Sequence, residues 1–206
     1  MIAIVDYGVG NLENVTRALG RAGASEVRIT REPKEILAAR AVVLPGVGHF
    51  GHCSRELHRL ELDAPVRQAR ARGIPLLGLC VGMQLFFESS EEDESAPGLG
   101  FYCGTVRRLS GEVRVPQTGW NAVRVSGAHP WLARVPDGAH FYFVHSYAAD
   151  PEDDVVLGTT DYGGEIPAIV GGEGMLGVQF HPEKSSRMGE RLLEGFVRSV
   201  EVRTSG

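Results

Sequence analysis

The stretch that decides the fold is "IPLLGLCVGMQLF", residues 74–86. Its apolar beginning has the length and composition of a buried strand. Cys80 then stands between Gly78 and Gly82, in the Gly-x-Cys-x-Gly pattern of a nucleophile elbow with cysteine in place of serine. Because such an elbow is a sharp turn between a strand and a helix, these residues predict a strand, a turn at the cysteine and a helix that reaches Phe87.

Short apolar runs alternate with helical patterns on the amino-terminal side of this elbow. Strands are predicted at residues 2–6, 26–29, 41–45 and 74–79, and helices at residues 12–22, from residue 33, at residues 55–72 and beyond the cysteine. This alternation is typical of a parallel sheet whose strands are joined by helices.

Beyond residue 99 the pattern changes to strands separated by turns. Strands are predicted in the segments 100–109, 120–125, 139–147, 155–160, 166–172 and 175–180, and a final helix at residues 186–202. We therefore expect an α/β fold of three layers, with a mixed, mainly parallel open sheet flanked by helices and a more antiparallel second half. Since no segment has the composition of a linker, residues 1–206 are expected to form one domain.

Composition limits the classes of partner and cofactor. The net charge is −5, and Lys and Arg are scattered, so a nucleic-acid partner is not expected. No leader-like segment or apolar run of about 20 residues is present, which predicts a cytoplasmic protein with no membrane partner. The three cysteines, Cys53, Cys80 and Cys103, lack the paired spacing of a disulfide framework or a zinc site. No metal and no cofactor are expected.

The elbow would place the sulfur of Cys80 at a helix amino terminus, whose partial positive charge favours the thiolate. A thiolate nucleophile needs a base, and the base needs a group that orients it. The segment "VQFHPE" supplies His181 and Glu183 at the end of a predicted strand, where Pro182 keeps the chain out of a helix. Taken alone, each segment has a structural alternative: a buried cysteine packed between glycines, and an ordinary surface turn.

Acyl chemistry also needs hydrogen-bond donors for the oxyanion. The segment "PGVGHFG", residues 45–51, follows a strand, and its glycines allow the backbone N–H groups of Val47 and Gly48 to face a ligand. The amide of Val81, directly after the cysteine, is a further donor. Nucleotide binding is rejected, because the Gly-Lys-Ser/Thr ending of a phosphate loop and the third glycine of a dinucleotide fingerprint are both absent.

The three motifs, in this order along the chain, resemble those of the class I glutamine amidotransferases. The resemblance covers nearly the whole chain and implies hydrolysis of L-glutamine to glutamate and ammonia. It assigns Cys80 as the nucleophile, His181 as general base and acid, and Glu183 as the group that orients the histidine.

The same resemblance implies a set of substrate contacts. Gln84 would hold the substrate one helical turn past the nucleophile, and Glu92 would lie near the α-amino group. His145, Ser146 and Tyr147 would lie beside the glutamine backbone. For Glu92 a solvated acidic loop is the alternative, and for the "FYFVHSY" segment the alternative is a strand that fills the core.

Finer features resemble one branch of the family, in which a glutaminase subunit serves histidine biosynthesis. They are the segments "VDYGVGNLENV", "GWN", "FYFVHSY" and "QFHPEKS". The branch implies a heterodimer with a cyclase subunit, a (β/α)8 barrel that uses the ammonia to make imidazole glycerol phosphate. Trp120 and Asn121 would then lie toward that partner, whereas a core position is the alternative for the tryptophan.

Two functional alternatives stay open at this point, namely the glutaminase subunit of another glutamine-dependent synthase and a non-catalytic regulatory subunit of the same fold. We also expect the loop at Gly46–Gly48 to control activity by turning a backbone N–H toward or away from the oxyanion.

Overall fold

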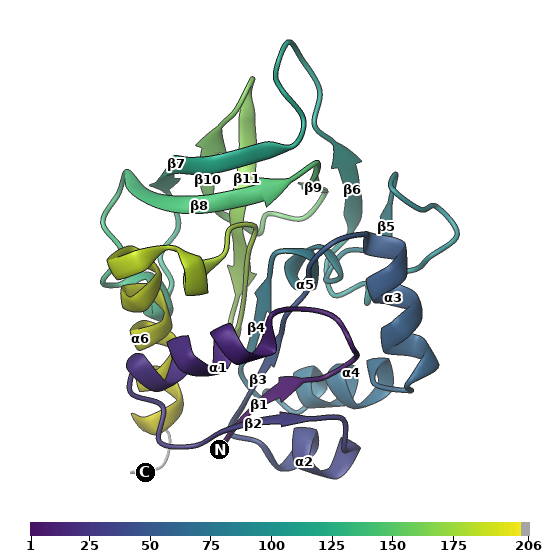
Figure 1. Cartoon of the computed structure of the whole chain (residues 1–206), viewed down its shortest axis with the longest axis vertical. Coiled ribbons are helices and arrows are strands. Elements are labelled where there is room, and N and C mark those ends of the chain that lie inside the picture. The colour runs from purple at the N-terminus through teal and green to yellow at the C-terminus, as the bar shows by residue number, and fades with distance from the viewer. Residues whose placement is uncertain (203–206) are drawn as a thin grey trace.

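A nine-stranded sheet forms the centre of the molecule in the computed structural model (Figure 1). Five neighbouring strands are parallel, in the order β2 (Val27–Thr30), β1 (Ile2–Val5), β3 (Ala41–Leu44), β4 (Leu76–Leu79) and β12 (Met175–Val178). Antiparallel strands complete it, in the order β11 (Glu165–Gly172), β10 (Val156–Asp161), β7 (Gln117–Val125) and β8 (Ala139–His145). A second sheet contains β5 (Ser89–Ser90), β6 (Gly104–Arg108) and β9 (Tyr147–Pro151). The structure describes residues 1–202, so residues 203–206 of the expected domain lie outside it.

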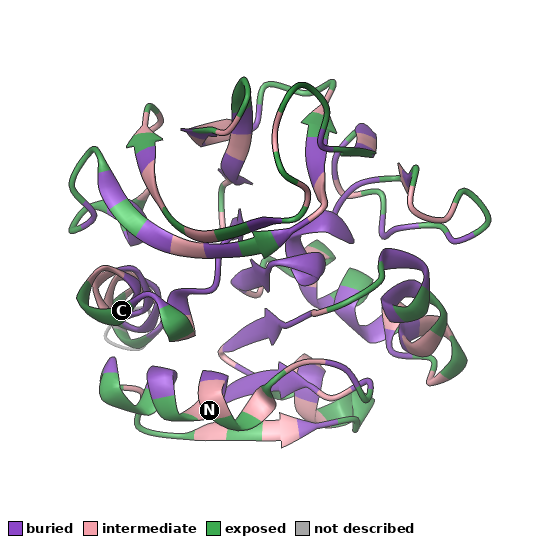
Figure 2. Cartoon of the chain, turned by 45° about the horizontal axis from the view of Figure 1, so that its top comes forward, coloured by how far each residue is buried: buried purple, intermediate pink, exposed green. Residues whose placement is uncertain are grey.

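Helices cover both faces of the parallel strands. One face carries α1 (Leu12–Arg21) and α6 (Ser186–Val202), and the other carries α2 (Pro33–Ala38), α3 (Phe50–Arg59) and α4 (Asp63–Ala71). Successive side chains of a strand point to opposite faces, and in β1 Ala3 and Val5 join one hydrophobic cluster while Ile2 and Ile4 join the other. The strands β1, β3 and β4 are therefore buried throughout (Figure 2). The three-layer α/β fold expected from the sequence is confirmed.

The single helix predicted at residues 55–72 is wrong, because the chain forms α3 and α4 with a turn between them. Glu61 adopts a left-handed conformation, with φ of +55°, and the Leu62 N–H donates to the Leu57 carbonyl at 2.9 Å. This is a Schellman motif, in which burial of both leucines compensates for the strained residue. The helix also starts earlier than predicted, because the His49 side chain accepts from the Gly51 N–H at 3.1 Å and caps it.

The helix after the cysteine is also shorter than predicted. It is α5 (Val81–Gln84), a single turn of 4 residues. The backbone N–H groups of Leu99 and Phe101 each donate to this region, to the Leu85 and Phe86 carbonyls at 2.7 Å, and replace the next helical turn. A helix this short has little macrodipole, so the electrostatic argument made for the cysteine from the sequence loses most of its weight.

The pairing of β4 with β12 brings the chemistry-bearing segments together. Leu79 lies opposite Val178 in this parallel pair, so the residues that follow, Cys80 and Gln179, leave the same edge of the sheet side by side. His181 follows two residues later.

Among the helices of residues 1–202, none is long and apolar enough to cross a membrane.

Candidate active site

Cys80 occupies a strained turn that neighbouring glycines permit. Its φ is +52°, in the region that favours glycine. A Cβ at Gly78 would lie 2.5 Å from the Phe86 ring, and a Cβ at Gly82 would lie 1.9 Å from the Leu44 carbonyl oxygen. The two glycines therefore allow β3 and the chain after the elbow to approach the cysteine closely. The packing holds Cys80 in its conformation, because larger neighbours would not fit.

His181 lies near both remaining members of the predicted triad. Its Nδ1 lies 2.8 Å from Oε1 of Glu183, and the imidazole lines the same cavity as Cys80, close enough for the cysteine to raise its pKa. The short 3₁₀ turn at Pro182–Lys184 returns the glutamate to the histidine two residues earlier. The structure thus brings together all three residues that the sequence singled out.

The protonation state of His181 follows from these contacts. Burial lowers its pKa, but the interactions with Cys80 and Glu183 outweigh burial and raise the pKa to about 9. Within the described chain, Oε2 of Glu183 has no hydrogen-bond partner, so this carboxylate is directed at the histidine alone. At neutral pH the site holds an imidazolium next to the Cys80 sulfur.

Gln179 is a member of the site that the sequence analysis missed. This fully buried side chain directs its Nε2 at the Cys80 sulfur, 3.7 Å away, and its Oε1 accepts from Nε2 of Gln84 at 3.0 Å. A signal for it was present, because side chains two residues apart in an extended segment share a face. By that rule Gln179 shares a face with His181, whereas Phe180 packs in the core.

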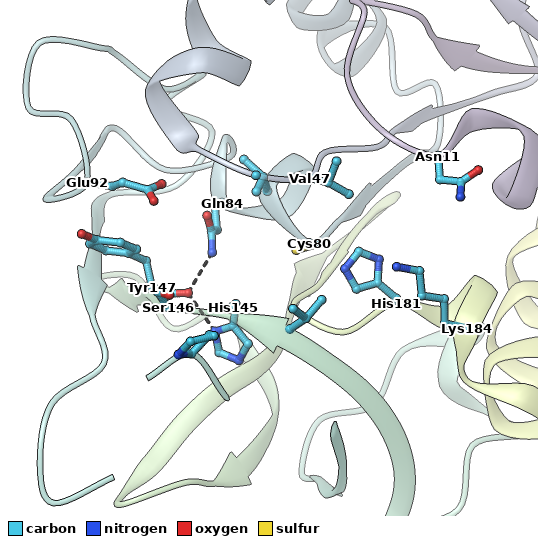
Figure 3. Close-up of a pocket in the computed structure, with 14 residues that line it drawn as sticks. Asn11, Val47, Cys80, Gln84, Glu92, His145, Ser146, Tyr147, His181 and Lys184 are labelled. Carbon is cyan, nitrogen blue, oxygen red and sulfur yellow. Dashed lines mark hydrogen bonds between the residues drawn. The ribbon is translucent and has the colours of Figure 1, made fainter. Parts of the chain in front are cut away.

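A cavity of about 440 Å³ opens beside the elbow (Figure 3). Of the residues predicted for the site, it is lined by Val47, Gly48, Cys80, Val81, Gln84, Glu92, His145, Ser146, Tyr147 and His181. Four further residues that the sequence analysis did not assign also line it, namely Asn11, Pro116, Val144 and Lys184. Lys184, Val144 and Asn11 could have been noticed, since they belong to the "QFHPEKS", "FYFVHSY" and "VDYGVGNLENV" segments. Pro116 comes from a segment that the sequence did not single out and that the fold brings here.

Two polar side chains in the cavity wall, those of Gln84 and Glu92, already use some of their hydrogen-bonding atoms within the protein. Nε2 of Gln84 donates to the Tyr147 carbonyl at 2.9 Å as well as to Gln179, and its oxygen points the other way (Figure 3). Oε2 of Glu92 accepts from the Phe50 N–H at 2.6 Å, at the start of α3. Gln84 and Glu92 can therefore each offer one side-chain oxygen to a ligand as a hydrogen-bond acceptor.

His145 is held by the protein through both of its ring nitrogens. Nδ1 lies 2.9 Å from the Tyr147 carbonyl and Nε2 lies 2.8 Å from the side-chain oxygen of Gln117. Burial lowers its pKa to about 4, assisted by the charge of nearby His181. A neutral ring has a single N–H, which Nδ1 donates to the Tyr147 carbonyl, so the Gln117 amide must turn its NH2 group toward the bare Nε2. His145 therefore positions the Tyr147 segment and has no free nitrogen for a ligand.

The predicted partner-facing residues lie outside the cavity. Trp120 is 53% exposed on β7 and packs edge-on against Tyr142 of β8, with ring centroids 6.2 Å apart. The core alternative for the tryptophan is therefore wrong. Val144, which is also exposed, lies on the same strand as Tyr142 and lines the cavity. Asn121 donates from Nδ2 to the Asp161 carbonyl at 2.9 Å, so its side chain links β7 to β10.

Comparisons with known proteins agree with this geometry. The family model of the class-I glutamine amidotransferases matches residues 3–200. A protein of Moorella thermoacetica named imidazole glycerol phosphate synthase subunit HisH is 47% identical over 95% of this chain and 93% of its own. The protein of the same name from Thermococcus kodakarensis is 48% identical over 96% of this chain and 100% of its own. A crystal structure of a glutamine amidotransferase has the same fold, with a TM-score of 0.76 and 20% identity over 97% of this chain and 98% of that one. The chain belongs to the class-I glutamine amidotransferase family, on the branch of the HisH subunits.

Proposed function

We propose that this chain, acting as one domain, is the glutaminase subunit of an imidazole glycerol phosphate synthase. It hydrolyses L-glutamine to glutamate and ammonia, and the ammonia passes to a cyclase subunit. The observation that carries the proposal is the placement of Cys80 and His181 in the wall of one cavity large enough for an amino acid, with Glu183 hydrogen-bonded to the histidine.

The proposed reaction starts from the Cys80 thiolate and the His181 imidazolium. The sulfur attacks the side-chain amide carbon of glutamine, and the histidine gives its proton to the nitrogen that leaves as ammonia. The neutral imidazole then takes a proton from water, whose oxygen attacks the γ-glutamyl thioester. Glutamate leaves, and the sulfur and the imidazole recover their starting states.

Backbone donors would stabilise the oxyanion in both steps. Val81 is the first residue of α5, so its N–H has no carbonyl partner within the helix and is free to donate. Val47 and Gly48 line the same cavity, in a loop whose Gly46 packs against Val81. One such donor is worth about 10²–10³ in rate, so its orientation decides much of the activity.

The substrate would bind through complementary polar groups. The free oxygen of Gln84 suits an N–H donor of glutamine, and the second oxygen of Glu92 suits the α-ammonium. Ser146 and Tyr147 would contact the substrate carboxylate side. His145 then acts indirectly, by holding the Tyr147 segment in place.

The proposed partner is a (β/α)8 cyclase, which docks on the apolar face made by Trp120, Tyr142 and Val144. Ammonia released into bulk water at neutral pH would be protonated and lose its nucleophilicity. A face that begins at the cavity wall suits direct transfer, because Val144 belongs to both.

The test is glutamine hydrolysis by the chain alone, with the cyclase, and with the cyclase and its ribonucleotide ligand. Glutamate release that rises with the liganded cyclase is expected, and Cys80→Ser should abolish it. Stimulation by a different glutamine-dependent synthase, and none by this cyclase, would assign the subunit elsewhere.

A further inference from the structure

Two buried, potentially reactive side chains lie outside the proposed reaction. Tyr7 follows β1 and Cys53 lies in the second turn of α3, and both are fully buried. Both form hydrogen bonds with the segment of residues 45–48, which is called the 45–48 loop below. The Tyr7 hydroxyl donates to the Pro45 carbonyl, and the Cys53 thiol donates to the Val47 carbonyl at 3.5 Å. The two side chains belong to the same hydrophobic cluster, and each influences the pKa of the other.

Both groups keep their protons. Burial raises the pKa of the Tyr7 hydroxyl well above its usual range and raises that of the Cys53 thiol to about 11. A protonated hydroxyl and a protonated thiol are donors, which is what two backbone carbonyls require. The pair is therefore suited to holding the loop and unsuited to nucleophilic chemistry.

The two hydrogen bonds fix the Pro45–Gly46 and Val47–Gly48 peptide planes, which lie on either side of a peptide plane that is not fixed. In a trans peptide the carbonyl and the N–H point in opposite directions, and the one cis peptide among the described residues is Val115–Pro116. The Gly48 N–H therefore points away from Cys53. Val47 and Gly48 line the cavity, whereas Tyr7 and Cys53 do not.

The intervening peptide, between Gly46 and Val47, has neither its carbonyl nor its N–H in a hydrogen bond within the described part of the chain. Gly46 and Val47 join this free plane to the two fixed planes, and Gly46, which has no Cβ, has the greater conformational freedom.

We propose that Tyr7 and Cys53 form a clamp that positions the 45–48 loop, directs the Gly48 N–H into the cavity and confines rotation to the Gly46–Val47 peptide. They are positioning residues, since neither lines the cavity, and the inference rests on the proposed glutaminase reaction. Loss of the clamp lets the Val47–Gly48 plane turn, so that an oxyanion donor is misdirected for part of the time.

The experiment uses Tyr7→Phe and Cys53→Ala in the complex with liganded cyclase. Cys53→Ser is the conservative variant, because its hydroxyl can still donate to the Val47 carbonyl. All proteins carry Cys103→Ala, which removes the exposed thiol and serves as the reference. Three quantities are measured: kcat and KM for glutamine hydrolysis, and the rate of Cys80 alkylation by iodoacetamide, followed by mass spectrometry. Circular dichroism checks that each variant is folded.

We expect kcat to fall about tenfold or more in Tyr7→Phe and in Cys53→Ala, up to the roughly 10²–10³-fold loss of a donor that is removed outright, because here the donor is misdirected for part of the time. KM should change less than twofold, and Cys53→Ser should recover most of the loss. Alkylation of Cys80 should keep its rate, because that reaction develops no oxyanion. A general disturbance of the site would slow both reactions.

Full kcat in both variants, or alkylation that slows in proportion to kcat, would overturn the clamp while the reference protein remains an active glutaminase. An inactive reference complex would overturn the proposed function and the clamp with it.

Discussion

Replacing Trp120 with alanine should weaken the complex with the cyclase without harming the glutaminase subunit itself. The side chain is 53% exposed, and an aromatic ring system of this size offers up to about 250 Å², so about 130 Å² can be covered by a partner. At about 25 cal/mol per Å², covering that area stabilises the complex by about 3 kcal/mol, or roughly 200-fold in Kd. The subunit's own stability should change little, because the lost contacts are mainly with Tyr142.

The assay is isothermal titration calorimetry of the subunit with the cyclase, together with glutamine hydrolysis at saturating cyclase. Arg198→Ala is the control, because Arg198 is exposed on α6, which packs on the buried side of β8. Trp120→Ala should raise Kd by about two orders of magnitude and leave kcat at saturation unchanged. A Kd within twofold of the wild type, alongside an unchanged control, would refute docking on this face.

Three other changes test the proposed chemistry. Glu183→Gln removes a group that raises the pKa of His181, so the alkaline limb of kcat, expected near pH 9 where the wild-type imidazolium loses its proton, should move to lower pH; an unmoved limb would contradict the pairing. The raised pKa of His181 also makes the free energy of unfolding depend on pH. Its contribution stabilises the fold in full below about pH 6.5 and is lost as the pH rises through 9. Gln179→Leu removes the amide donor to the Cys80 sulfur and should lower kcat about tenfold, consistent with one net hydrogen bond, whereas wild-type kcat would remove Gln179 from the site. Gly48→Pro forbids the φ of +85° and deletes an N–H, so stimulated hydrolysis should vanish while calorimetry still detects the complex; full stimulated turnover would exclude control by this loop.

The elbow and the order of strands could be predicted because each depends on local sequence. An apolar run flanked by glycines defines β4 and the turn at Cys80, and the second such strand, β12, carries the histidine to the same edge. The adjacency of His181 to Cys80 then follows from parallel pairing. The layer architecture follows from the same alternation of strands and helices.

What could not be predicted depends on contacts between distant segments. The break between α3 and α4 falls at Glu61, where burial of Leu62 compensates for a strained residue. Pro65, in the first turn of α4, is a local sign that a new helix starts here, but it does not show where the first helix ends. The end of α5 is set by backbone donors from residues 99–101. His145 looked like a ligand residue because it is polar at a strand end, yet Gln117, far away in sequence, occupies its second nitrogen.

The same holds for the support of the 45–48 loop. Tyr7 and Cys53 belong to different elements, and nothing in either local sequence indicates that they hold carbonyls of one loop.

The most direct test of the central claim is covalent trapping at Cys80. A diazoketone analogue of glutamine is incubated with the complex, and the digested protein is analysed by mass spectrometry. If Cys80 is the glutaminase nucleophile, the adduct lies on the peptide that contains it, forms in step with loss of hydrolysis, is slowed by excess glutamine and is absent in Cys80→Ser. An adduct on Cys53 or Cys103, or hydrolysis that persists in Cys80→Ser, would contradict the assignment.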